Sequence, residues 1–196
     1  MARPREFDMD EALDAAISTF WTQGYKATSM ADLVEATGLQ KGSIYKAFHD
    51  KHDLFMKSLT RYLEGGYQMM QAALSGPESP IEGLRAWLHT TILMCRDQPV
   101  QRGCMAINTA VELGPHDSEV SALLQRHHER ASRLLAETIK QGQQRGQIRS
   151  DLTAEQLAKS LFVFSVGLLG MSKVLSPDTM DAEEMVEFAL AMAAPC

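Results

Sequence analysis

The chain has 196 residues, of which 45% are hydrophobic, so it is long enough to bury a sizeable core as one domain or as two small ones. Its formal net charge of −6 excludes the strongly basic composition of proteins that hold nucleic acid mainly by overall charge. The three cysteines, an odd number, favour reduced thiols over a disulfide scaffold. No apolar stretch has the length of a membrane span, and the first residues lack the pattern of a signal peptide, so we expect a cytoplasmic protein.

Apolar periodicity and capping signals predict an all-α chain of about nine helices. Asp8 with Glu11 marks the start of a first helix that runs to about Gln23. Asp50 is placed to cap a helix that continues to about Leu74, and the Gly- and Pro-rich segment 75–80 then breaks the chain. Further helices are expected at 81–96, 104–113, 118–144 and 154–175, with a last one starting at Asp181.

The most informative stretch is 28–48, which holds two short helical patterns on either side of Gly38. Glycine takes the left-handed conformation at low cost, so it suits the point where the first of these helices must end. Ser29 with Asp32 resembles a capping box for that helix. The apolar residues of the stretch would bury one side of the pair, and its polar residues would lie on the other. This pattern predicts a helix-turn-helix whose second helix enters the major groove of DNA, although a small helical hairpin with a solvated face remains an alternative.

Charge and glycine placement support the first of these two interpretations. From residue 40 to residue 48 the chain carries Lys41 and Lys46 and no acid, which predicts a local basic face on an acidic protein. Gly42 falls in the first turn of the second helix, where glycine costs about 1 kcal/mol relative to alanine, and close approach of DNA would explain it. Arg3 and Arg5 form a basic arm that would enter the minor groove or else remain a disordered tail.

At this point the residues resemble the TetR/AcrR family of bacterial regulators. The resemblance covers residues 1–56 and implies a helix-turn-helix domain there, with its motif at 29–48, followed by a ligand-binding and dimerisation domain at 57–196. Two departures from the family pattern are Val34, where a small residue is usual, and Gln40, where a serine often caps the recognition helix. The residues that carry the resemblance are Phe20, Gly24, Tyr25, Thr28, Gly38, Lys41 to Tyr45, Phe48, Lys51, Leu54 and Phe55.

The resemblance also implies the roles of individual residues on DNA. Gln40, Lys41 and Ser43 would lie near bases, and the amide of Gln40 is able to make a bidentate contact to adenine. Thr28, Tyr45 and Lys51 would lie on phosphates. The full set of predicted DNA-binding residues is Arg3, Arg5, Thr28, Gln40, Lys41, Gly42, Ser43, Tyr45, Lys46 and Lys51.

Two late helices carry more apolar surface than one subunit is expected to cover. The helix at 118–144 has an apolar stripe on an otherwise polar surface, and the segment 161–171 is apolar on nearly every side. We therefore predict that these helices, at 118–144 and 154–175, meet their copies in a homodimer, which would favour a palindromic operator. Burial of the apolar helix within the monomer is the alternative.

Cys104 is the candidate sensor residue, because it would lie near a helix N-terminus with Arg102 close by, and both features lower a thiol pKa. Cys95 is close enough in sequence to act as a resolving partner. The stretch from Gly103 to Pro115 resembles a subgroup of the family that includes electrophile-responsive regulators. The alternative is that both cysteines are ordinary buried residues.

An effector pocket is expected among the fourth to eighth helices. For each candidate the alternative is an ordinary place in the core. The candidate lining residues are Tyr67, Trp87, Met94, Met105, Asn108, Phe162 and Phe164.

We therefore predict a homodimeric repressor that a small molecule or an electrophile releases from double-stranded operator DNA, without a cofactor. A helical protein-interaction adaptor is one alternative, and an enzyme with Cys104 as nucleophile and His116 as base is another. We do not expect a metal site at His127 and His128, because adjacent residues do not share a helix face.

Overall fold

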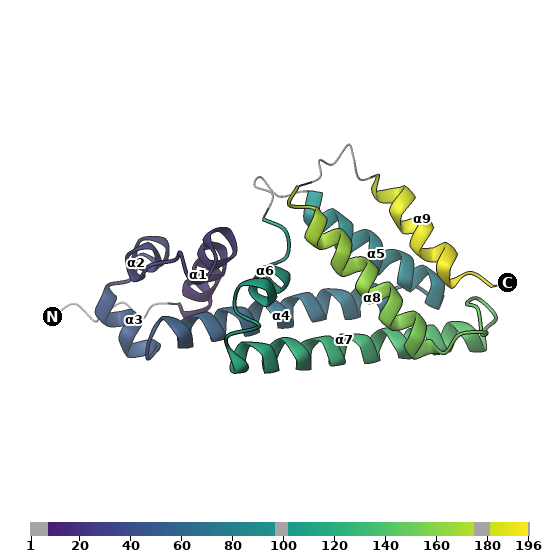
Figure 1. Cartoon of the computed structure of the whole chain (residues 1–196), viewed down its shortest axis with the longest axis horizontal. Helices are drawn as coiled ribbons and strands as arrows, with labels where there is room; N and C mark the ends of the chain where they lie inside the picture. The colour runs from purple at the N-terminus through teal and green to yellow at the C-terminus, as the bar shows by residue number, and fades with distance from the viewer. Residues whose placement is uncertain (1–7, 97–101, 175–180, 196) are drawn as a thin grey trace.

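The computed structural model describes residues 8–96, 102–174 and 181–195 (Figure 1), and these ranges contain nine α-helices and no strand. The all-α prediction is thereby confirmed. None of the described helices combines the length and the apolar character that crossing a membrane requires. The helices are α1 (Met9–Gln23), α2 (Met30–Thr37), α3 (Lys41–Ala47), α4 (Lys51–Ser75), α5 (Pro80–Arg96), α6 (Met105–Glu112), α7 (Ser118–Gln144), α8 (Ala154–Met171) and α9 (Ala182–Ala193).

Side-chain caps explain why several of the helices begin where the sequence predicts. The Asp8 carboxylate accepts hydrogen bonds from the first-turn N–H groups of Asp10 and Glu11. Ser29 and Asp32 form the expected capping box: the Asp32 carboxylate accepts from the Ser29 N–H at 2.7 Å, and the Ser29 hydroxyl accepts from the Asp32 N–H at 3.2 Å. The largest difference is at the end of α8, which stops at Met171 instead of continuing to about 175.

Two hydrophobic cores lie along the molecule, and α4 belongs to both. The first surrounds Phe20 of α1, whose ring meets the Phe55 ring edge-on at 5.0 Å. The second contains Trp87 of α5 and Leu135 of α7. α4 contributes Phe55 to the first core and Leu74 to the second. At about 1.5 Å per residue, its 25 residues extend for about 37 Å, alongside α7 in Figure 1. The expected boundary near residue 56 therefore falls inside one continuous helix.

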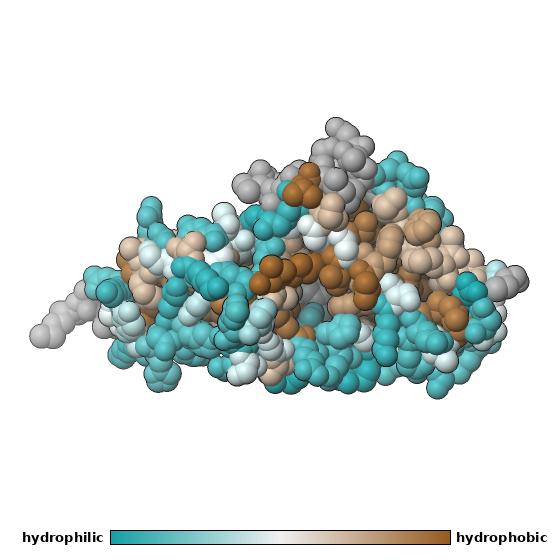
Figure 2. Space-filling model, in the orientation of Figure 1, coloured by the Kyte–Doolittle hydropathy of each residue, from teal (hydrophilic) through white to brown (hydrophobic). Residues whose placement is uncertain are grey.

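The apolar surface of α7 and α8 is covered unequally. The stripe on α7, which includes Ala131, Leu135 and Ile139, is buried inside the subunit. Leu161 of α8 is buried as well, but Val163 on the same helix is 66% exposed. Figure 2 shows apolar side chains gathered over the half of the molecule that holds α8 and α9. This half of the subunit therefore keeps an uncovered apolar face.

The turn between α1 and α2 is held by side chains from other helices. The Glu112 carboxylate, at the end of α6, accepts hydrogen bonds from the backbone N–H groups of Tyr25 at 2.9 Å and Lys26 at 2.7 Å. Gly24 precedes them with φ +83°, and a Cβ there would lie 2.9 Å from the Glu112 carboxylate, so glycine is required for both reasons. Glu112 thus joins the α1–α2 turn to α6.

We expect Glu112→Ala to lower the free energy of unfolding by about 1–2 kcal/mol, because two backbone N–H groups lose their acceptor. Urea denaturation followed by circular dichroism measures the change. Glu129→Ala is the matched control, since Glu129 is exposed on α7 and accepts a hydrogen bond only within its own helix. Equal stability of the two variants would contradict a structural role for the Glu112 contact.

Candidate DNA-binding surface and effector cavity

The helix α3 is fixed by its buried side and presents its polar side outward. Ile44 is 1% exposed and packs in the first core with Leu33 of α2. Gly38 ends α2 in the left-handed conformation, with φ +66°, so the chain turns directly into α3. Gln40 occupies the N-cap position of α3, but its side chain makes no capping hydrogen bond. The outward residues are Gln40, Lys41, Gly42, Tyr45 and Lys46, with Ser43 half-buried beside them.

No steric constraint within the subunit requires a glycine at position 42. A Cβ at this position would meet no atom within 4 Å, and the backbone there is an ordinary helix. The helix therefore carries a residue of low helix propensity on an open surface, where another molecule can approach the backbone closely. Tyr45 is 44% exposed beside it, and the Lys41 Nζ lies 5.8 Å from the centre of the Tyr45 ring.

Two of the predicted phosphate contacts have partners inside the subunit. Thr28 is 1% exposed, and its hydroxyl donates a hydrogen bond to the Gly24 carbonyl at 2.6 Å, so this side chain is not available to a phosphate. The Lys51 ammonium donates to the carbonyls of Tyr25 at 3.0 Å and Thr28 at 2.9 Å, which leaves one N–H. The cause is the α1–α2 turn, whose carbonyl groups need donors that the turn itself lacks.

Arg3 and Arg5 lie outside the described residues. The side chains of Met94 and Cys95 also lie outside the part that the structure describes.

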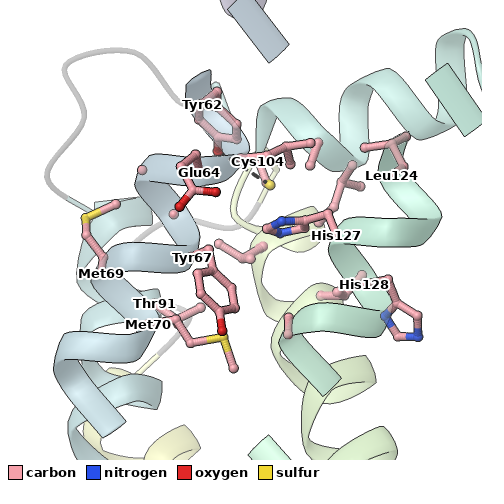
Figure 3. A pocket seen from close by; sticks show the side chains of 18 of the residues that line it. Tyr62, Glu64, Tyr67, Met69, Met70, Thr91, Cys104, Leu124, His127 and His128 are labelled. Carbon is pink, nitrogen blue, oxygen red and sulfur yellow. Dashed lines mark hydrogen bonds between the residues drawn. The ribbon is translucent and has the colours of Figure 1, made fainter. Parts of the chain in front are cut away.

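A cavity of about 850 Å³ lies between α4, α6, α7 and α8, with further walls from α1 and α5 (Figure 3). Of the predicted lining residues, Tyr67, Trp87 and Phe162 line it, and so does Cys104, the predicted sensor residue. Its volume is in the range of pockets that hold small molecules.

Three other predicted lining residues lie elsewhere. Met105 is buried in the first core, and Phe164 packs against the second core. The Asn108 side chain bonds the Arg102 carbonyl and the Lys173 ammonium. The sequence also gave no signal that Trp21 and Tyr62 would line the cavity, because both belong to helices that the motif assigns to or near the DNA-binding unit.

Cys104 lies where α6 begins, in a cluster of aromatic and polar groups. The Tyr62 hydroxyl donates to the Cys104 Sγ at 3.6 Å and accepts from the Met105 N–H at 3.3 Å. The Trp21 Nε1–H donates to the Gly103 carbonyl at 3.0 Å, and the Trp21 and Tyr62 rings meet edge-on at 5.1 Å. The start of α6 is therefore tied to both α1 and α4 at the cavity wall.

The charged residues at the cavity are neutralised by close partners. Arg130 donates to the Glu64 carboxylate at 2.6 Å, and this hydrogen bond lowers the Glu64 pKa. The same guanidinium group lies 3.5 Å from the centre of the Tyr67 ring. Arg61 donates to Asp14 at 2.7 Å, and this bond lowers the Asp14 pKa. Burial, and secondly the nearby Arg130, lowers the pKa of His127, so its imidazole is neutral at pH 7.

An exposed recognition helix, joined to a helical unit with a cavity, defines a DNA-binding regulator that also has room for a small molecule. Comparison with known proteins agrees. Residues 12–56 match the model of the tetR family of bacterial regulatory proteins, and residues 80–190 match the tetracyclin repressor-like C-terminal domain. The chain belongs to the TetR family of transcriptional regulators.

Relatives and solved structures extend this result. The chain is 36% identical over 162 residues to the HTH-type transcriptional repressor ComR of Escherichia coli (strain K12), which covers 81% of this chain and 76% of ComR. A cysteine mutant of the TetR family regulator CifR, solved with 26-base-pair operator DNA, has a TM-score of 0.83 and 30% identity, over 98% of this chain and 100% of that one. Reduced NemR of E. coli shares the fold, with a TM-score of 0.83 and 18% identity, over 94% of this chain and 96% of NemR.

The lowered pKa of His127 predicts a pH-dependent stability. The unfolded chain takes up a proton near the ordinary pKa of 6.5, whereas the folded chain does so only at lower pH. The contribution of neutral His127 is therefore complete above pH 6.5 and is lost as the pH falls toward the folded pKa. We expect the wild type to lose more unfolding free energy than His127→Gln between about pH 7.5 and pH 5.5.

Urea denaturation at the two pH values measures this difference. His116→Gln is the control, because His116 is exposed in the turn before α7. If His116→Gln reduced the pH dependence as much as His127→Gln, the burial of His127 would not be the cause.

Proposed function

We propose that this regulator is a homodimeric repressor that binds a palindromic operator through α3 and releases it when a small molecule or an electrophile engages the cavity. The observation that supports operator binding most directly is the outward side of α3, with two lysines, a glutamine and an open Gly42. The similarity to ComR, a repressor, and to CifR, solved with operator DNA, supports the same role. A cytoplasmic location follows from this role, because the operator lies there.

The side chains of α3 divide into base and phosphate contacts. Gln40, Lys41 and Ser43 lie at the N-terminal end of the helix, the end that a recognition helix points at base edges. Tyr45 and Lys46, one turn further on, are placed for phosphates, and Lys51 retains one N–H for the same purpose. We assign Thr28 a structural role in the turn, and we assign its side chain no contact with DNA.

We expect Lys41→Ala and Lys46→Ala each to weaken binding to the operator and to reduce the salt dependence of binding by about one unit in the slope of log K against log salt. Mobility shifts with DNA from upstream of the chain's own gene, at several salt concentrations, measure both effects. Lys140→Ala is the control, since Lys140 is exposed on α7. A wild-type protein without salt-sensitive, sequence-specific binding would refute the proposal.

The homodimer is proposed to form through α8 and α9. Val163 of α8 is 66% exposed and Phe188 of α9 is 58% exposed, and no residue of α7 is among the large exposed hydrophobic residues of the described chain. We therefore assign α9, instead of the predicted helix at 118–144, as the partner of α8 in the interface. The glycines at 167 and 170 on α8 meet no atom within 4 Å of an added Cβ, which leaves room for a second subunit.

We expect Phe188→Asp to convert the dimer into a monomer and to weaken operator binding, because a monomer presents one recognition helix where the dimer presents two linked ones. Sedimentation velocity measures the oligomeric state. Val111→Asp places the same charge on α6, at a residue that is 78% exposed and outside the two helices assigned to the interface, so it should remain dimeric. A monomeric wild type, or a dimeric Phe188→Asp variant, would contradict the assignment.

The signal is proposed to pass along α6. Cys104 and its Tyr62 contact lie at the cavity end of this helix, and Glu112 holds the α1–α2 turn at its other end. A ligand or adduct that moves α6 would therefore move the first three helices relative to α4. With an electrophilic alkene, the Cys104 sulfur would form a C–S bond while the thiol proton passes through water to the neighbouring carbon.

We expect N-ethylmaleimide to release wild-type protein from its operator and to leave Cys104→Ser bound. Mobility shifts after treatment, with mass spectrometry of the adduct, make this measurement. Cys95→Ser is the control and should behave as the wild type does. Release of Cys104→Ser at the same rate as wild type would refute Cys104 as the sensor.

We assign no catalytic role to this chain, and we place the DNA-binding domain at residues 1–56 and the ligand-binding and dimerisation domain at 57–196. His116, the proposed base of the enzyme alternative, is exposed in the turn before α7 and is not among the residues that line the cavity with Cys104. The matched family models, which end at residue 56 and begin again at residue 80, support the division.

A further inference from the structure

The charges and rings around the cavity restrict the chemistry of its ligand. Aromatic side chains contribute much of the wall, from four different helices: Trp21 of α1, Tyr62 and Tyr67 of α4, Trp87 of α5 and Phe162 of α8. Such walls stack well against planar rings and offer few hydrogen bonds. The small hydroxyl groups nearby are already engaged, since the Ser165 hydroxyl donates to the carbonyl of Phe162 within α8.

The cavity provides no unbalanced cation for an anionic ligand. Among the described lining residues, the ionised groups are Asp14, Arg61 and Glu64. Arg61 is shared between two carboxylates, Asp14 at 2.7 Å and Asp10 at 2.8 Å. Glu64 faces the same space in Figure 3, and an anion would approach this carboxylate. Removal of a carboxylate or sulfonate from water is unfavourable when no counter-charge meets it.

A cationic ligand is disfavoured for a different reason. Two described carboxylates line the cavity. Asp14 is held by Arg61 at 2.7 Å, and Glu64 is held by Arg130 through two hydrogen bonds, at 2.6 and 3.4 Å. The Arg130 guanidinium is fixed further by the face of the Tyr67 ring at 3.5 Å. An ammonium ion would have to displace this group from Glu64. His127, which is neutral, adds a hydrogen-bonding group without adding charge.

We propose that this cavity selects uncharged aromatic molecules and excludes aromatic carboxylates, sulfonates and ammonium ions of the same size. The Glu64–Arg130 pair on the Tyr67 ring is the element that sets this preference, and His127 supplies a hydrogen bond to a neutral polar group of the ligand. The inference rests on the proposed function, because it names the chemical class of the signal for the same cavity.

Both tryptophans of the chain line the cavity, so intrinsic fluorescence reports its occupancy. The probes are phenylnaphthylamine, which is neutral, and anilinonaphthalene sulfonate, which has the same rings and one negative charge. Each accepts energy from tryptophan when bound. Naphthylmethanol and naphthylmethylammonium, as competitors for the neutral dye, give the matched comparison for a cation.

With the full-length dimer we expect the neutral dye to bind about tenfold or more tightly than the sulfonate, and naphthylmethanol to compete better than naphthylmethylammonium by a similar factor. Glu64→Gln leaves Arg130 without its carboxylate. This variant should therefore bind the sulfonate more tightly, which reduces the preference for the neutral dye over the sulfonate. Glu129→Gln, an exposed change next to Arg130, should keep the wild-type ratio. Val166→Phe, which adds a ring to the cavity wall, should weaken the neutral dye.

Equal or tighter binding of the sulfonate or the ammonium ion by wild type would overturn the proposal. An unchanged ratio of dye affinities in Glu64→Gln, or undiminished binding of the neutral dye by Val166→Phe, would also overturn it, because the dye would then not be bound against this wall of the cavity. Operator binding is measured on the same samples without dye. Its loss would count against the proposed repressor function, whereas the ratio of dye affinities is determined without DNA and tests the ligand class separately.

Discussion

The placement of the DNA-binding helices depends on the short turn between α1 and α2. Its backbone exposes carbonyl and N–H groups that neither helix satisfies, and unsatisfied groups of this kind are unfavourable in a packed interior. Lys51 from α4 supplies the donors, and Glu112 from α6 supplies the acceptor. A cation and an anion from two different helices therefore hold one turn, and α1 and α2 take their position relative to both helices from it.

Because of this arrangement, two helices link the α1–α2 turn, which precedes α2 and α3, to the rest of the chain. The long helix α4 carries Lys51 at its first residue and cavity residues such as Tyr62 further along. The short helix α6 carries Glu112 at its end and begins just after Cys104. The helices α4 and α6 thus each connect the cavity to the turn. A shift of α6 relative to α4 would therefore act directly on the turn that precedes α2 and α3.

Much of the fold was predictable because its determinants are local. Asp8, Ser29 and Asp50 each cap the helix that follows them, and such signals are visible within four residues of sequence. The hydrogen bonds of Thr28 to the Gly24 carbonyl and of Lys51 to the turn were not predicted, because the carbonyls that need donors are visible only in three dimensions. Periodicity likewise reports an apolar stripe on α7, but it does not report that this stripe is already covered inside the subunit.

The sequence predicted most of the helices that line the cavity, but not all of them. Aromatic residues of α4, α5 and α8 were expected there, but Trp21 belongs to α1, which the motif places with the DNA-binding unit. Asp14 and Ile17 of the same helix line the cavity as well. The helix α1 therefore belongs both to the DNA-binding unit and to the wall of the cavity. A chimera that joined this helix-turn-helix to the helical body of another regulator would therefore carry Asp14, Ile17 and Trp21 into the cavity of the new protein, and would change its wall together with the recognition helix.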